Sequence, residues 1–140
     1  MTRWPAEDIW QAVWPLLPDF TVEVLPEIDS SNSELMRRAR AGRLEPVLLV
    51  AERQTAGRGR LGRHWHSAAG DSLTFSLGMA LAPGDWSGLS LAVGIGLNIA
   101  PRAAEGLSTP PAALRDLEPA AAAGGALRKI AEPLVRTLQA

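Results

Sequence analysis

The sequence predicts an α/β domain of mixed type, in which helices pack against a mixed sheet. First, segments whose apolar residues have helical spacing alternate along the chain with short runs that resemble strands. Second, a length of 140 residues suits a single domain over residues 1–140. Third, an apolar share of 46% and a charged share of 21% are typical of a soluble globular protein with a hydrophobic core.

The N-terminal part predicts a helix, a strand and a second helix. In the stretch PAEDIWQAVWPLL the apolar residues have helical spacing, and Pro5 suits a first helical turn. Residues 20–25, FTVEVL, alternate with period two and predict a strand. The second helix is predicted to begin with a capping box formed by Ser31 and Glu34 and to end near Gly42.

The central part predicts two strands separated by a charged loop. Residues 46–52, PVLLVAE, form a short apolar run that is typical of a buried strand. Residues 72–81, SLTFSLGMAL, place large apolar residues at odd positions and small or polar residues at even positions, which predicts a further strand. The loop therefore connects two rigid strands, and such loops commonly carry binding sites.

The C-terminal part predicts one amphipathic helix and contains one ambiguous segment. In residues 85–101, DWSGLSLAVGIGLNIAP, the first half can start a helix capped at Asp85, whereas the glycines and β-branched residues of the second half favour a strand and a turn. Residues 108–125 are a Pro- and Ala-rich connection that holds one short helix. The apolar stripe of residues 126–140 predicts a helix that is kinked or interrupted at Pro133.

The loop TAGRGRLGRHWHS concentrates arginine and glycine without any carboxylate. Arginine presents a planar fork of donors that matches two phosphate or carboxylate oxygens at once. The neighbouring glycines let backbone N–H groups approach an anion closely, and Trp65 can stack on a flat ring. The loop is typical of a site for an anion attached to a planar group, such as a nucleotide; a solvated turn is an equal alternative.

Charge and composition disfavour other kinds of protein. With a net charge of −1, no overall positive field draws the chain to nucleic acid or to a membrane. No Gly-Lys-Ser or Gly-Lys-Thr of a P-loop occurs. His64 and His66 have no third ligand nearby in sequence, so no metal site is predicted. The chain has no cysteine and its first residues are not those of a signal peptide, so a cytoplasmic location is expected.

Five stretches together resemble the biotin protein ligases, the biotin–[acetyl-CoA carboxylase] ligases. In order they read IDSSNSELM, AERQTAGRGRLGRHWHS, SLTFSLGMAL, LSLAVG and GIGLNIAP. The Gly-Arg-Gly-Arg block is the most specific, and the resemblance covers residues 22–101. It implies that biotin is joined to AMP with ATP and Mg²⁺, and that the biotinyl group then passes to a lysine of the biotin carboxyl carrier protein of acetyl-CoA carboxylase.

The resemblance also implies roles for individual residues. The expected biotin contacts are Ser30, Ser31, Asn32, Gln54, Gly57, Arg58, Gly59 and Arg60. The expected nucleotide contacts are Arg58, Arg60, Trp65 and Asn98. Arg58 and Arg60 are also the expected catalytic residues, since the loop of this family closes over biotinyl-AMP and grips its phosphate and acyl oxygens. ATP and Mg²⁺ are expected as co-substrate, without a metal ligand from the protein.

Part of the pattern of this family is absent. The family carries a Lys-Trp-Pro-Asn-Asp segment and a catalytic lysine before GIGLN, whereas here LSLAVG runs directly into IGLNIAP. Lys129, in the late amphipathic helix, is the only lysine. The expected domain therefore lacks part of the central sheet and one wall of the site. An N-terminal DNA-binding domain and a C-terminal barrel are also not expected.

Three functions stay open at this point. One is a biotin–protein ligase whose catalysis is impaired by the missing segment. The second is a non-catalytic remnant that binds biotin or its adenylate. The third and weakest is a nucleic-acid or anion binder that uses the arginine loop, because four arginines in a chain of net charge −1 give little positive field. Neither DNA nor a membrane is an expected partner, and a homodimer is left open.

Overall fold

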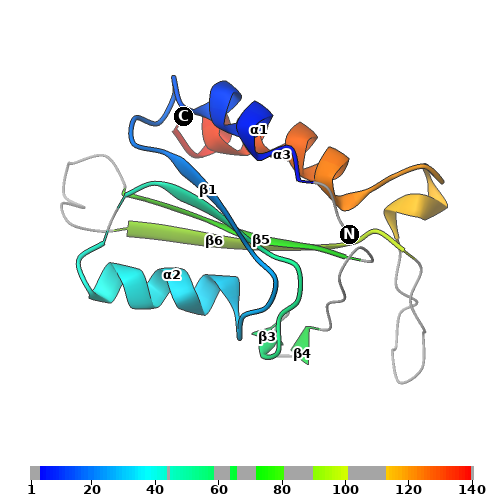
Figure 1. Ribbon diagram of the computed structural model, residues 1–140, viewed down its shortest axis with the longest axis horizontal. Helices are drawn as coiled ribbons and strands as arrows, with labels where there is room; N and C mark the ends of the chain where they lie inside the picture. Colours follow the sequence, from blue (N-terminus) through cyan, green and yellow to red (C-terminus); the bar gives the residue numbers. More distant parts are fainter. Residues whose placement is uncertain are drawn as a thin grey trace.

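The computed structural model describes residues 4–43, 45–58, 64–65, 72–80, 90–100 and 113–139. Within these residues the chain is layered, with α1 and α3 on one face of a four-stranded sheet and α2 on the other face (Figure 1). The elements are α1 (Ala6–Val13), β1 (Thr21–Leu25), α2 (Ser31–Arg40), β2 (Val47–Ala51), β3 (Gly57–Arg58), β4 (His64–Trp65), β5 (Ser72–Ala80), β6 (Ser90–Asn98), η2 (Leu114–Asp116) and α3 (Ala123–Gln139).

The order and direction of the strands decide which residues meet. The large sheet has the order β1-β2-β5-β6, and β1 and β2 are parallel, whereas β5 is antiparallel to both β2 and β6. The carboxyl ends of β1, β2 and β6 therefore lie at one end of the sheet, together with the start of β5. We call this the polar end. Helix α2 follows β1, so its N-terminus also lies there (Figure 1).

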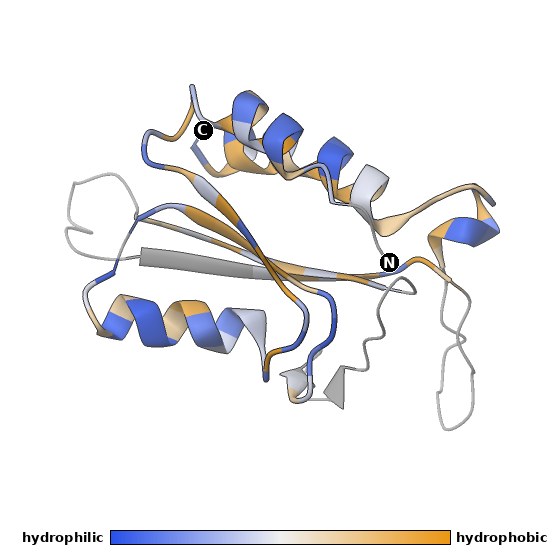
Figure 2. Ribbon diagram, viewed as in Figure 1, coloured by the Kyte–Doolittle hydropathy of each residue, from blue (hydrophilic) through white to orange (hydrophobic). Residues whose placement is uncertain are grey.

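The two faces of β5 serve different purposes. Its odd residues Leu73, Phe75 and Leu77 are fully buried in one cluster with residues of α1 and α3, among them Ile9 and Leu127. Burial of such side chains contributes roughly 1.5–3 kcal/mol each. The even residues are small or polar and face α2. Figure 2 shows mainly hydrophobic residues along β1 and β2 and a largely hydrophilic α2.

Most predicted elements are confirmed, but the predicted capping box at the start of α2 is wrong. The N-cap is Ser30, whose Oγ accepts a hydrogen bond of 3.3 Å from the backbone N–H of Ser33. Ser31 is already the first helical residue, and its side chain is turned into the protein. Glu34 does not reach back to the cap, because its carboxylate pairs with Arg37 and Arg38.

The ambiguous segment is a strand from Ser90 onwards, so the helix predicted for its first half is wrong over residues 90–93. Asp85, the predicted cap, lies outside the described residues. Strand β6 pairs with the whole of β5, from Ser72↔Asn98 to Ala80↔Ser90. The physical reason is that small residues at even positions and apolar residues at odd positions continue through the segment, which gives it the period of a strand.

The C-terminal helix is longer and more continuous than predicted. Helix α3 begins at Ala123, and Pro133 lies inside it without interrupting it. Pro133 is exposed, so water can reach the carbonyl group that its missing N–H leaves without a helical partner. The short helix expected in the connection is η2.

Candidate functional site

The polar end brings together three parts of the chain that are far apart in sequence. Ser30 and Ser31 come from the start of α2, Gln54 from the loop after β2, and Ser76 from β5. All four are buried polar residues. Buried polar groups are normally hydrogen-bonded, and the partners of these residues define the site.

Ser31 is the centre of this polar cluster. Its backbone N–H donates to Gln54 Oε1 over 2.7 Å, and its Oγ lies 3.1 Å from the same oxygen. The Oγ atoms of Ser31 and Ser76 are 2.7 Å apart. The start of α2 is therefore fastened both to the loop after β2 and to the middle of β5.

The chemistry of these groups gives the hydrogen bonds a direction. An amide oxygen only accepts, so the single hydroxyl hydrogen of Ser31 points to Gln54 Oε1. Ser76 must then be the donor in its bond with Ser31. Ser31 is consequently unable to donate to a ligand, but its oxygen keeps a lone pair that can accept a ligand N–H. Ser30 differs, since its oxygen accepts from Ser33 and its own hydroxyl hydrogen remains able to donate.

Asn32 adds a buried acceptor to the site. Its Oδ1 is buried and has no hydrogen-bond partner in the described part of the chain. This oxygen lies against Gly94 of β6, where an added Cβ would come within 3.3 Å of it. Gly94 and its same-face neighbour Gly96 are exposed and contribute no Cβ to the surface beside Asn32. An acceptor beside a bare strand suits a flat ligand with an N–H group.

A set of hydrogen bonds joins the start of α2 to the beginning of the arginine loop. The backbone oxygen of Asp29 accepts from the N–H of Ala56 over 2.8 Å, and Ile28 forms a bridge with Gln54. The Asp29 carboxylate accepts from the N–H of Ser30 and from both terminal nitrogens of Arg37. Arg37 and, second, the N–H of Ser30 lower the pKa of this carboxyl group to about 2.

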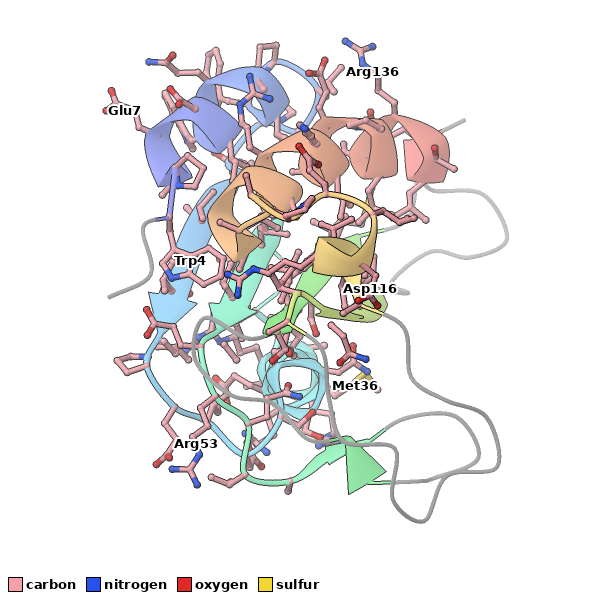
Figure 3. The ribbon with its side chains drawn as sticks, turned by 90° about the vertical axis from the view of Figure 1, so that its right-hand side faces the viewer. Trp4, Glu7, Met36, Arg53, Asp116 and Arg136 are labelled. Carbon is pink, nitrogen blue, oxygen red and sulfur yellow. The ribbon has the colours of Figure 1, made fainter. Side chains whose placement is uncertain are left out.

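Two further ion pairs involve the surroundings of the site. Arg38 of α2 binds both oxygens of Glu23 on β1, at 2.7 and 2.9 Å, which fastens the helix to the sheet. This bond lowers the pKa of Glu23. Arg53 pairs with Glu27 at 2.8 Å and lies near β3 on the same side of the sheet as α2 (Figure 3). One arginine near the loop is thus already neutralised by a carboxylate.

The other predicted site residues lie around this cluster. Gly57 is buried in β3 and pairs with Trp65, while Arg58 pairs with His64 through the backbone. Figures 1 and 3 place this small sheet beside the start of α2. Asn98 ends β6 at the polar end, opposite Ser72. The side chains of Arg58 and Trp65, and all of Gly59 and Arg60, lie outside the described residues.

Sequence reasoning missed two residues of the site, namely Ser76 and Gly94. The available signal was the row of small and polar residues at even positions of β5. That row indicated a face without large apolar side chains, but it did not reveal that the start of α2 lies over it.

The only lysine is far from this cluster. Lys129 is exposed on α3, and α3 covers the face of the sheet opposite α2. Over the described ranges, no group of three or more His, Cys, Asp or Glu side chains could hold a metal ion. Nor does any helix in those ranges have the length and apolar character needed to cross a membrane.

Comparisons with known proteins show to which family the chain is similar. The sequence profile of the biotin/lipoate A/B protein ligase family matches residues 26–112. A biotin–[acetyl-CoA-carboxylase] ligase of Mycobacterium tuberculosis is 41% identical over 59 residues, which are 41% of this chain and 22% of that protein. The bifunctional ligase/repressor BirA of Escherichia coli is 45% identical over 65 residues, which are 46% of this chain and 20% of that protein.

A solved structure extends the likeness to most of the fold. The biotin protein ligase from Aquifex aeolicus, in complex with biotin and ATP, superimposes with a TM-score of 0.59 and 20% identity. This alignment covers 84% of the present chain and 69% of that one. The predicted α/β fold, a mixed sheet packed against helices, is thereby confirmed as that of a biotin protein ligase.

The profile match includes more than half of the residues, so the chain belongs to the biotin/lipoate A/B protein ligase family. The predicted resemblance is confirmed at this level. The segments that align with the Mycobacterium tuberculosis and Escherichia coli ligases span about a fifth of the length of those proteins.

Proposed function

We propose that this chain is the biotin-binding part of a biotin–protein ligase. The proposed substrates are biotin and ATP with Mg²⁺, and the proposed acceptor is a lysine of a biotin carboxyl carrier protein. Membership of the ligase family and the name of the Mycobacterium tuberculosis relative support this assignment.

The observation that carries the proposal is the unpartnered Asn32 Oδ1 beside the Ser30–Ser31 start of α2. The ureido ring of biotin has two N–H groups and one carbonyl oxygen. Asn32 Oδ1 can accept from one N–H, and the remaining lone pair of Ser31 can accept from the other. The Ser30 hydroxyl can donate to the carbonyl oxygen. Each N–H group and the carbonyl oxygen of a cyclic urea thus have a hydrogen-bonding partner in the cluster.

The proposed reaction has two steps. A carboxylate oxygen of biotin attacks the α-phosphorus of ATP, and pyrophosphate leaves as biotinyl-5'-AMP forms. The amine of the carrier lysine then attacks the acyl carbon, loses a proton and releases AMP. Arg58 and Arg60 are proposed to stabilise the phosphate and acyl oxygens on which charge develops, and Trp65 and Asn98 to contact the nucleotide.

The position of Lys129 favours a second candidate, a binding remnant with little catalysis. This lysine lies on α3, across the sheet from the cluster, so it is not placed to neutralise the reacting carboxylate and phosphate. Removal of one preorganised donor from a transition state costs roughly 3–4 kcal/mol, or about 10²–10³ in rate. The chain is therefore expected to bind biotin and its adenylate better than it makes the adenylate.

The location and partners of the protein are part of the proposal. We assign the reaction to the cytoplasm, in line with a chain that has no cysteine. That DNA is not a partner stays a prediction, since the Escherichia coli relative is named a repressor as well as a ligase.

Calorimetric titration of the full chain tests the proposed function. Biotin and biotinyl-AMP should both bind, whereas lipoic acid, a carboxylate without a ureido group, should bind much more weakly. Absence of binding by both biotin compounds would refute the proposal. Exchange of labelled pyrophosphate into ATP then separates the two candidates, because a binding remnant gives binding without exchange.

A further inference from the structure

Thr74 is the one other described residue with a buried side-chain atom that lacks a partner. It is only 5% exposed, and its Oγ1 has no hydrogen bond in the described part of the chain. An unsatisfied buried hydroxyl is costly, and native proteins seldom keep one without a reason. Asn32 Oδ1 is the other such atom, and it belongs to the proposed biotin site.

The position of Thr74 connects it with that site. It lies on the same face of β5 as Ser76, two residues closer to the polar end. It pairs with Gly96 of β6. Ser76 pairs with Gly94, against which Asn32 lies. Asn32 of α2 thus lies against Gly94, and Thr74 of β5 pairs with Gly96, the next exposed glycine on the same face of β6.

We propose that Thr74 is a ligand contact, and that its hydroxyl group forms a hydrogen bond with the ureido ring of biotin lying over Gly94 and Gly96. This inference rests on the proposed function. Gly94 and Gly96 are exposed and carry no Cβ, so a flat ring can approach the backbone of β6 next to the Asn32 side chain, which lies against Gly94. The ureido oxygen has two lone pairs, so the Thr74 hydroxyl can donate to the one that the Ser30 hydroxyl does not occupy.

The proposal predicts two opposite effects of one substitution. Thr74→Val keeps the branched shape of the side chain and removes the unsatisfied hydroxyl. The ligand-free protein should then be at least as stable as the wild type, with a urea midpoint that is not lowered. The dissociation constant for biotin should rise about tenfold, because the ligand loses a buried hydrogen bond. A purely structural role of Thr74 would lower the stability instead.

The experiment compares Thr74→Val with Thr21→Val, an exposed position at the start of β1. Calorimetric titration with biotin and with desthiobiotin, which keeps the ureido ring and lacks the sulfur, measures affinity; urea unfolding measures stability. We expect Thr21→Val to change neither, and Thr74→Val to weaken both ligands equally. Thr74→Ser, which keeps the hydroxyl, should bind like the wild type. If the valine variant does not fold, Thr74→Ala replaces it in the comparison with serine.

The possible failures can be told apart. Wild-type protein that binds neither ligand would overturn the proposed function, and this inference with it. Wild-type binding with an unchanged affinity in Thr74→Val would overturn the role of Thr74 alone. A loss for biotin but not for desthiobiotin would overturn the assignment to the ureido ring, since the hydroxyl would then face the sulfur.

Discussion

The hydroxyl oxygens of Ser31 and Ser76 lie 2.7 Å apart, although 45 residues separate them in sequence. This bond joins the first residue of α2 to the middle of β5 and, through Ser31, to Gln54. Three segments of the site are therefore held by one buried side chain, and the loss of that side chain should disturb both stability and binding.

Ser31→Ala should lower the free energy of unfolding by about 1–3 kcal/mol, because it leaves the buried Ser76 hydroxyl without its acceptor. Biotin affinity should fall as well. Ser33→Ala, two residues further along α2, is the control, since only the backbone N–H of Ser33 takes part in the cap. Urea unfolding measures the difference. Equal stability of the two variants would show that the cluster does not hold α2.

Gly94→Ala should reduce biotin affinity more than it reduces stability. The added methyl group would meet Asn32 Oδ1 at 3.3 Å and would stand on the surface proposed for the ligand. Gly125→Ala is the matched control, because its Cβ would meet nothing within 4 Å. That helical substitution should stabilise the protein by about 0.5–1 kcal/mol without a change in binding. Calorimetric titration that found normal binding in Gly94→Ala would place the ligand elsewhere.

The Asp29–Arg37 pair should make stability depend on pH in the acid range. The pKa of Asp29 is lowered from 3.8 to about 2 in the folded state. A lowered pKa stabilises the folded protein above the unfolded-state value, and this contribution is lost as pH falls from about 4 to about 2. The stability difference between wild type and Asp29→Asn should therefore shrink over that range.

Urea unfolding at several pH values between 5 and 2 measures this difference. Both side chains are 45% exposed, so solvent screening keeps the effect small. The Arg37→Ala variant serves as the control, because Asp29 has lost its main partner in it. In that background, Asp29→Asn should change the free energy of unfolding less. A constant difference down to pH 2 would contradict the role of Asp29.

Local sequence patterns were enough to predict the helices, the strands β2 and β5, and the family. They were not enough to predict whether Ser30 or Ser31 is the N-cap of α2. Both residues suit a cap, and the bonds of Ser31 with Gln54 and Ser76, distant in sequence, decide the matter. A capping rule that considers only neighbouring residues has no access to such partners.

Strand β6 shows the same limit. Its first residues also fit a helix, and the pairing with β5 along its whole length selects the strand. Thr74 could not be found from sequence either, since its polar side chain looks like the outer face of a strand. Only the three-dimensional arrangement shows that this face is buried beside the start of α2.

The arginine loop gives a last prediction. Arg58→Ala should weaken the binding of biotinyl-AMP by about ten- to a hundredfold, the value of a hydrogen bond to a charged group. Arg43→Ala is the control, because Arg43 is exposed after the end of α2 and lies outside the proposed site. The proposed partner of Arg58 is the phosphate, so its loss should weaken the binding of biotin itself much less than the binding of the adenylate.

Added salt should weaken adenylate binding more in the wild type than in Arg58→Ala, since screening acts on the interaction that the variant lacks. Calorimetric titration of both ligands at two salt concentrations measures all of these differences. Equal adenylate affinity in the two variants would remove Arg58 from the site and leave the loop as a solvated turn.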